Sequence, residues 1–327
     1  MSLTAPAPQR RQKPSEFFTA DEIAELTARS DAMGWLAMLF TWGVIAATLA
    51  ALAYWPHPLM WVAALLILGG RQLSLAILMH DAAHGTLFKS RWCNNVLANY
   101  ACGSAIGVDI ERYRRHHLAH HAKTGSEDDP DLSLSAPFPT TRASLMRKCL
   151  RDLAGVSGLK REYGLVLMNL GLIRWTVASD IVRLPQEGRR WHDYLRDGAS
   201  NLWRPLAFQA VLFAILLACG HGWLYLAWIG AYLTTYSLFM RLRSISEHAC
   251  TAPGPDMLRN TRTTRAGLLA RATVAPLNVN FHIEHHLMPA VPYFRLPRMH
   301  RLLLGRGMVA APPGYLQVLL QASTAPL

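Results

Sequence analysis

Four apolar stretches, arranged in two pairs, limit what this chain can fold into. They cover residues 33–55, 58–79, 202–219 and 223–240. A helix needs about 20 apolar residues to cross the hydrocarbon core of a bilayer, and each stretch is close to that length. Within each pair the link is only two or three residues long, so we expect two membrane hairpins.

The distribution of charge predicts the sidedness of these hairpins. The chain has a formal net charge of +12, and its Lys and Arg residues lie mostly in the N-terminal, middle and C-terminal regions outside the apolar stretches. Loops rich in Lys and Arg stay in the cytoplasm, so we expect both termini and the middle region there. Nucleic-acid binding is the alternative for such a charge, but no base-reading motif accompanies it.

The chain is expected to have three parts. Residues 1–32 are predicted to be a cytoplasmic N-terminal segment with an amphipathic helix, because Thr19 and Glu22 form a capping-box pattern. Residues 33–309 are predicted to be the membrane domain, with a basic helix over residues 141–153 at the membrane surface. Residues 310–327 are predicted to be a loosely held tail.

Three arginines stand at the inner ends of the apolar stretches. Arg71 interrupts the second stretch, and Arg241 and Arg243 close the fourth. A charge within the bilayer costs at least about 2.5 kcal/mol, so we interpret these arginines as marks of the cytoplasmic membrane surface. An ion pair at mid-membrane depth is the alternative for Arg71.

Two shorter apolar stretches, residues 96–110 and 163–178, are not expected to cross the membrane. Each is interrupted by polar residues, and stretches of this length are more typical of buried or interfacial helices. A single crossing by either one would also place the histidine groups described next on opposite sides of the membrane. A metal site shared by those groups would then be impossible.

Eight of the 14 histidines fall into three tight groups. The groups are His80 and His84, then His117, His120 and His121, and finally His282, His285 and His286. Residues three and four positions apart share one face of a helix, so each group is expected to present its imidazoles in one direction. Three such faces that converge would place eight imidazoles in one volume.

This number of imidazoles indicates two metal ions. One metal rarely accepts more than six ligands, and a zinc site usually uses only three or four. A pair of metals with a larger coordination number suits the pattern; we favour iron, and ligand counting alone leaves zinc open. The five cysteines form no CxxC pair, which argues against a thiolate site or a disulfide framework.

Five of the other histidines are not expected to bind metal. His116 lies roughly 100° around the helix from His117 and is left outside the ligand set. A histidine that stands alone is more typical of a surface or headgroup position than of a metal site. The histidines of this kind are His57, His192, His221 and His300.

The three groups have the form HxxxH, HxxHH and HxxHH, and they resemble the three histidine boxes of the membrane fatty acid desaturase family. The flanking residues are similar as well. GRQ at residues 70–72 leads into the first group, DPD at residues 129–131 follows the second, and LMP at residues 287–289 follows the third. These segments are highly specific for the superfamily and weakly specific for the substrate.

The resemblance implies an all-α integral membrane protein with four transmembrane helices in two hairpins and a cytoplasmic helical cap that holds a di-metal site. It implies two iron ions held by the eight histidines, with His248 in the segment SISEH at residues 244–248 as a ninth ligand. It also implies O2 and a separate electron donor of ferredoxin or cytochrome b5 type, because the HPGG stretch of a fused cytochrome b5 does not occur. The organic substrate would be an acyl lipid or an acyl thioester.

Polar residues next to the expected ligands are candidates for orienting them. Asp81, Glu247 and Glu284 each adjoin such a histidine, and a carboxylate can orient and polarise an imidazole. The run at residues 128–131 fits that role and a simple turn equally well. Asn278 is expected one helical turn before His282, where it would reach a metal through water or cap the helix.

The reaction that these features favour is the insertion of a double bond into a fatty acyl chain. A hydroxylase or ketolase that acts on lipids, carotenoids or alkanes is the alternative on the same scaffold. A zinc-binding membrane transporter or sensor is the alternative from another class, but the apolar stretches carry almost no polar ligand residues. Residues 73–79 and 101–108 either line a tunnel for the acyl chain or pack the interior, and we favour packing.

Overall fold

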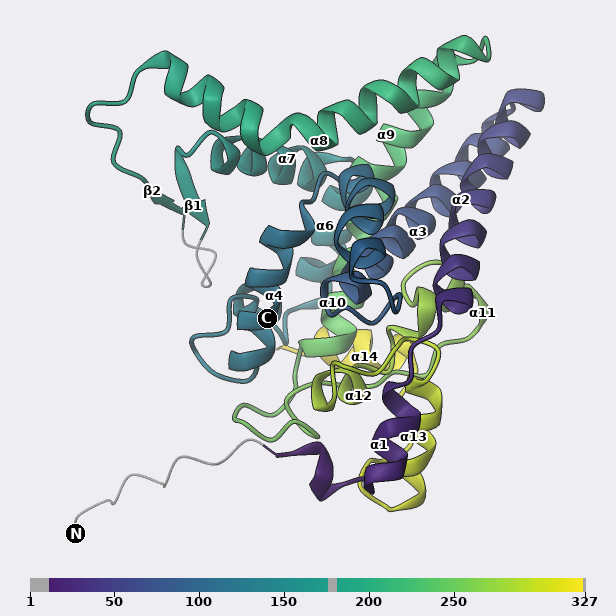
Figure 1. Cartoon of the computed structure of the whole chain (residues 1–327), viewed down its shortest axis with the longest axis vertical. Helices are drawn as coiled ribbons and strands as arrows, with labels where there is room; N and C mark the ends of the chain where they lie inside the picture. Colours follow the sequence, from purple (N-terminus) through teal and green to yellow (C-terminus); the bar gives the residue numbers. More distant parts are fainter. Residues whose placement is uncertain (1–11, 176–180, 326–327) are drawn as a thin grey trace.

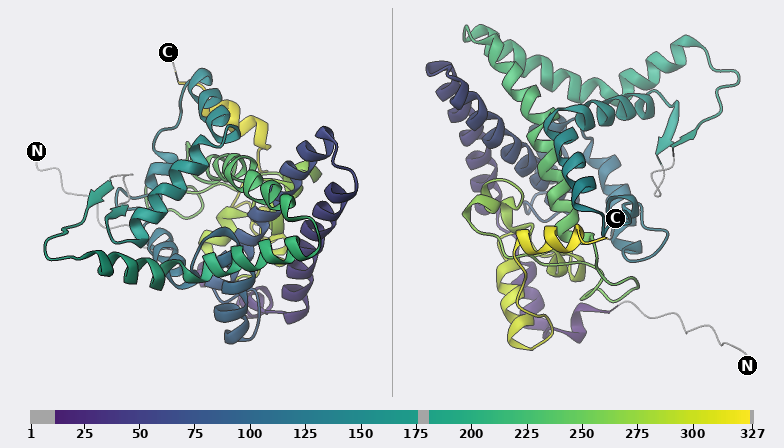
Figure 2. Two further views of the ribbon diagram at one scale, coloured as in Figure 1. Left: turned by 90° about the horizontal axis from the view of Figure 1, so that it is seen from above. Right: turned by 180° about the vertical axis from the view of Figure 1, so that it is seen from behind.

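The structure is a computed structural model that describes residues 12–175 and 181–325. Parts of the predicted N-terminal segment, of the stretch 163–178 and of the predicted tail lie outside the described residues, at 1–11, 176–180 and 326–327. Long helices extend from one side of the molecule, and shorter helices and loops gather at the other (Figures 1 and 2).

The described part of the chain is mostly helical. The α-helices are α1 (Ala20–Thr27), α2 (Asp31–Tyr54), α3 (Pro58–Ala83), α4 (Ile110–Lys123), α5 (Leu132–Ser135), α6 (Arg142–Leu153), α7 (Val156–Asn169), α8 (Trp191–Ala218), α9 (Tyr225–Leu233), α10 (Thr235–His248), α11 (Leu268–Ala272), α12 (His282–Leu287), α13 (Leu296–Gly305) and α14 (Tyr315–Ala322). Short 3-10 or π-helical turns cover Pro14–Glu16, Cys93–Leu97, Asn99–Gly103, Ser104–Ile106, Gly222–Leu224 and Pro276–Asn278. One antiparallel pair of strands, β1 (Ile173–Trp175) and β2 (Ile181–Arg183), departs from the predicted all-α fold.

Three segments of the described chain are long and apolar enough to cross a membrane. They are Ala20–Tyr54, which contains α2, and the helices α3 and α8. α2 packs against α3 after a short turn, and α3 also contacts α4, α9 and α10. Pro58 stands in the first turn of α3, where its missing N–H leaves no helical hydrogen bond unmade. α3 is therefore the central helix of the fold.

The fourth apolar stretch is not the single helix that was expected. Its residues are divided between α9 and α10 by a break at Thr234, whose φ of −108° and ψ of −87° are not helical. The next residue, Thr235, donates its hydroxyl to the carbonyl of Leu65 on α3. The two helices lie so close there that a Cβ on Gly69 would be 2.2 Å from Thr235 Oγ1. We attribute the break to this contact with α3.

Other predicted elements are present with some changes. α1 opens with a complete capping box, in which Thr19 accepts from the Glu22 amide and Glu22 accepts from the Thr19 amide. α6 covers the predicted basic helix. Residues 96–110 form short helical turns that are buried over much of residues 98–106, while Val96 and Tyr100 are exposed. In the stretch 163–178, however, α7 ends at Asn169 and the chain turns into the β1–β2 hairpin.

The three arginines are used for contacts inside the fold. Arg71 is only 8% exposed and donates to the carbonyl of Ala272 at 3.0 Å, with no acidic partner among the described residues. Arg241 Nη2 binds Asp152 Oδ1 of α6 at 2.8 Å. Arg243 Nε donates to Glu247 Oε1 at 2.8 Å, and its side chain is 14% exposed. These contacts do not place the three arginines relative to a membrane, so their interpretation as marks of the membrane surface stays a prediction.

The C-terminal region contains a packed helix in place of the loosely held tail. α14 contacts α10, and its residues Val318 and Ala322 are each 1% exposed. The backbone of Thr140 donates to the carbonyl of Ala322 at 2.8 Å and accepts from the amide of Ala325 at 3.1 Å. These bonds tie the end of the described chain to the segment before α6.

Candidate metal centre

The structure brings together all nine histidines that were predicted as ligands. They come from four helices, which are α3, α4, α10 and α12. His80 is in the last turn of α3 and His84 caps that helix, while His248 is the last residue of α10. The second histidine group lies on α4 and the third on α12. Helix periodicity therefore directs each group inward, as the spacing predicted.

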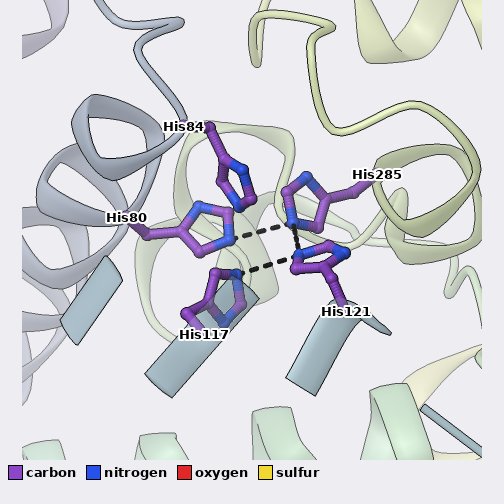
Figure 3. Close-up of side chains that lie close together, drawn as sticks. All are labelled: His80, His84, His117, His121 and His285. Atoms are coloured by element: carbon purple, nitrogen blue, oxygen red, sulfur yellow. Dashed lines mark hydrogen bonds between the residues drawn. The ribbon is translucent and has the colours of Figure 1, made fainter. Parts of the chain in front are cut away.

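The first set of nitrogens belongs to five histidines, which are His80, His84, His117, His121 and His285. One ligand atom from each lies within 4.8 Å of those of the others. His80 Nε2 is 3.0 Å from His285 Nε2, which is 2.9 Å from His121 Nε2, which is 3.0 Å from His117 Nε2. Figure 3 shows these side chains pointing toward one another.

The second set adjoins the first and contains His120, His248, His282 and His286. His282 Nε2 lies 2.8 Å from His248 Nε2 and 3.1 Å from His286 Nε2. The His120 ring faces the His248 ring with a centroid separation of 4.9 Å. The rings of His121 and His286 stack at 4.2 Å and connect the two sets.

These distances fit two metal ions. Two cis ligands on bonds of about 2.1 Å lie about 3.0 Å apart, which is the spacing between neighbouring Nε2 atoms in both sets. His84 Nε2 is buried and has no hydrogen-bond partner among the described residues. A buried nitrogen without a partner is costly unless a metal takes its lone pair. The donor set is all imidazole, which suits iron and zinc alike.

Burial keeps these imidazoles in the form that binds metal. It lowers the pKa of His285, His282 and His286 well below the usual range, and the neighbouring histidines lower it further. Burial likewise lowers the pKa of His84 to about 4. Only a neutral imidazole has a free lone pair, so a low pKa favours metal binding at neutral pH.

Three side chains contact the Nδ1 atoms of three of the imidazoles. His80 Nδ1 is 2.9 Å from Asp81 Oδ1, as expected for an orienting carboxylate. His120 Nδ1 is 2.6 Å from Asp129 Oδ1. The Thr124 hydroxyl lies 3.3 Å from His286 Nδ1. A carboxylate on Nδ1 fixes the tautomer and leaves Nε2 for a metal.

Two of these groups were not singled out from the sequence. Asp129 belongs to the run at residues 128–131 whose role was left open, and its carboxylate also accepts from the Asp131 amide at 2.8 Å. It therefore combines the turn and the orienting role. Nothing in the local sequence marks Thr124, because an isolated threonine after a histidine group is ordinary.

The Glu247 carboxylate lies close to the Nε2 side of the second imidazole set, where a metal would bind. Its carboxylate belongs to a further group of potential ligand atoms with His248 and His282, and its Oε2 is 3.6 Å from His282 Nε2. Burial raises the pKa of Glu247 to about 7, and the positive charge of Arg243 opposes that rise. Glu247 can therefore supply an oxygen ligand or hold a proton beside the second set. The sequence analysis did not predict this ion pair, although the i,i+4 spacing of Arg243 and Glu247 is a signal that could have indicated it.

Glu284 is buried but is bound to groups other than the predicted ligands. Its carboxylate accepts from the Thr263 hydroxyl at 2.5 Å and contacts His300 Nδ1 at 2.7 Å. His300 is 8% exposed, so its expected surface position is wrong. The His300 contact joins α12 to α13, and the Thr263 contact joins α12 to the loop between α10 and α11. His116, by contrast, remains outside both sets, with Nε2 2.8 Å from Asp131 Oδ1.

Asn278 does not lie on the helix that carries the third histidine group. α12 begins at His282, and Asn278 has a φ of 58° in a separate turn. Its amide donates to the carbonyl of Tyr293 at 3.2 Å and accepts from Arg271 at 3.4 Å. The expected position one helical turn before His282 is therefore wrong, and the side chain does not cap α12.

Comparisons with known proteins identify the family of this chain. The sequence matches the family model described as Fatty acid desaturase over residues 56–316, which include all nine histidines. It is 27% identical to a dihydrorhizobitoxine desaturase of Bradyrhizobium elkanii, over 91% of this chain and 80% of the relative. A beta-carotene ketolase of a Paracoccus strain is 25% identical over 84% of this chain and 93% of the relative. A Delta(5) fatty acid desaturase of Caenorhabditis elegans is 25% identical over 71% and 54% respectively.

Proposed function

This chain belongs to the fatty acid desaturase family, and we propose that it inserts a double bond into the acyl chain of a lipid, using O2 and two iron ions. The observation that carries this proposal is the pair of adjoining imidazole sets with ligand-like spacing. Five histidines would hold one iron, and four, with Glu247 beside them, would hold the other. Three apolar segments support a membrane location.

Removal of hydrogen from an unactivated methylene needs a strong oxidant, which a reduced di-iron centre supplies from O2 when bound. The chain itself keeps the imidazoles neutral by burial and fixes their orientation through Asp81 and Asp129. Burial of most of these histidines also limits the access of bulk water to the site.

The overall reaction balances with an external reductant. Two hydrogens leave adjacent carbons, and two electrons with two protons from a donor complete the reduction of O2 to two waters. A separate ferredoxin or cytochrome b5 would supply those electrons. We further propose that the site and both termini face the cytoplasm, with α8 and the broken helix α9–α10 as the second hairpin. The Lys- and Arg-rich regions support this orientation.

Expression in a host of known lipid profile, followed by lipid mass spectrometry, tests the activity. We expect an unsaturated lipid that is absent from the host. His120→Ala removes a buried ring of the second set and should abolish the product, whereas His192→Ala removes an exposed ring and should leave it. An unchanged product in the His120→Ala chain would remove this residue from the site.

Ketone formation is the second candidate, because two of the relatives are beta-carotene ketolases of Paracoccus strains. Both reactions need the same histidine sets, so the metal centre does not separate them. The mass of the product does. Desaturation removes two hydrogens from the lipid, whereas ketone formation replaces the two hydrogens of a carotenoid methylene with one oxygen. Co-expression with a carotenoid-producing pathway and analysis of both product classes would decide between them.

A further inference from the structure

A cavity of about 430 Å³ lies between α6, α7 and α10, apart from the two imidazole sets. Residues of α10 line one part of it, among them Tyr236, Met240 and Ser244. Its basic lining residues are Lys148, Arg151, Lys160, Arg161 and Arg241. The cavity therefore combines an apolar interior with a strongly positive rim.

Most of this positive charge is not neutralised by the protein. Arg241 is paired with Asp152, and Arg161 with Glu162. For the other three cations, Lys148, Arg151 and Lys160, no ion pair exists among the described residues; Lys148 Nζ donates only to the Ser144 hydroxyl at 2.9 Å. Burial and the nearby arginines, Arg241 first, lower the pKa of Lys148. An anion between these residues would relieve their mutual repulsion.

Large apolar side chains are exposed on α6 and α7, beside the cavity. Leu150 is 56% exposed, Leu159 is 60% exposed and Tyr163 is 68% exposed. A helix with basic residues on one face and large apolar residues on the other lies in the interface between headgroups and acyl chains. A lipid could therefore move sideways from the bilayer into the cavity without leaving its apolar surroundings.

One residue, Phe138, is shared by this cavity and by a second cavity that reaches the histidines. Phe138 lines the cavity and also a smaller one of about 250 Å³, whose walls include Asp129 and His248. Ser244 stands one helical turn before His248 on α10, and its hydroxyl is buried without a hydrogen-bond partner among the described residues. An acyl chain that follows α10 past Phe138 would reach the second imidazole set, and Ser244 could donate to an ester carbonyl on the way.

We propose that this cavity binds an anionic phospholipid as the substrate, with its phosphate at Lys148, Arg151 and Lys160 and one acyl chain directed past Phe138 toward His248. This assignment rests on the proposed desaturase function, because it names the substrate class of that site. Charge complementarity and the interfacial apolar faces favour a lipid of the bilayer over a soluble acyl thioester.

Native mass spectrometry of the full chain in detergent tests the site without requiring turnover. Phosphatidylglycerol is titrated against phosphatidylcholine, and we expect the anionic lipid to bind more tightly. The double substitution Lys148→Gln with Arg151→Gln should weaken phosphatidylglycerol binding at least about tenfold, since two cations leave the phosphate. The matched control, Arg142→Gln with Arg147→Gln, removes the same charge from α6 outside the cavity and should change binding less than about twofold.

A variant that retains both charges tests whether the loss of binding comes from misfolding. Lys148→Arg with Arg151→Lys should bind phosphatidylglycerol nearly as the original chain does. Equal weakening by the cavity and control substitutions would overturn the site. The site would also be overturned if an acyl-coenzyme A thioester bound in a way that depends on Lys148 and phosphatidylglycerol did not. Product analysis in the same preparations separates the two proposals. Lipid binding that depends on Lys148 in a chain that makes no product would overturn the desaturase function and leave the lipid site.

Discussion

The Nε2 atoms of His80 and His285 lie 3.0 Å apart, although 205 positions separate the two residues in the chain. His80 reaches this point from the end of α3 and His285 from α12. The first imidazole set therefore exists only when these distant segments are packed together. Metal binding and folding should be coupled in consequence, because an unfolded chain has no such set.

Removal of metal should lower the thermal stability of the protein. A ligand that binds only the folded state stabilises it by about 4 kcal/mol at a thousandfold excess over Kd, so we expect a strong chelator to reduce Tm by roughly 5–10 °C. A thermal scan of the detergent-purified chain with and without chelator measures the change. His285→Ala, which already lacks one ligand, should show a smaller response, and an equal response would contradict the coupling.

Asp129→Asn should weaken the second imidazole set. The change removes the charge that faces His120 Nδ1 at 2.6 Å, and loss of an orienting carboxylate typically costs 10–100-fold in metal affinity or activity. Metal titration of the chelator-treated protein measures the affinity. Asp128→Asn is the matched control, because Asp128 is exposed and adjacent in the chain. Similar effects of both substitutions would argue against the orienting role.

Arg243→Met should destabilise the metal-free protein by about 3 kcal/mol, because it leaves the Glu247 carboxyl buried without its ion-pair partner. The double variant with Glu247→Gln should recover most of that loss. Denaturant or thermal unfolding after chelator treatment measures both. A double variant that is no more stable than Arg243→Met would show that the pair is not the cause.

Gly69→Ala should destabilise the contact between α3 and α10. The added methyl would lie 2.9 Å from the Tyr236 amide nitrogen as well as near the Thr235 side chain, so the backbones must separate. Overpacking of this kind costs about 1–3 kcal/mol. Gly43→Ala on α2, where a Cβ meets nothing within 4 Å, is the control and should be neutral or slightly stabilising. Unfolding midpoints of the two variants provide the comparison.

The histidine sets were predictable because spacing alone decides which side chains share a helix face. The side chains of His117, His120 and His121 point in one direction on any α-helix. The requirement that all three groups bind the same metals placed them on one side of the membrane. His248 has no neighbouring histidine and depended on the family resemblance. His300 was misplaced although the sequence held a signal for its burial. It lies on the same helical face as Leu296, Met299 and Leu303, which are all buried on α13.

The breaks in the helices could not be predicted from the sequence. Thr234 interrupts an apolar stretch that has no Pro, and the break follows the contact of α10 with α3. Before α12, Leu277 and Asn278 have φ values of 54° and 58°, a conformation that Asn tolerates but Leu rarely adopts. Tertiary contacts impose both features, so local propensity predicted continuous helices where the chain turns.

Metal analysis of the full chain, purified from cells without added chelator, tests the central claim most directly. Two imidazole sets that each hold an iron predict two irons per chain, with one iron lost or weakly held in variants of His285 and of His282. One zinc per chain without iron, or a single metal unaffected by either substitution, would contradict the account.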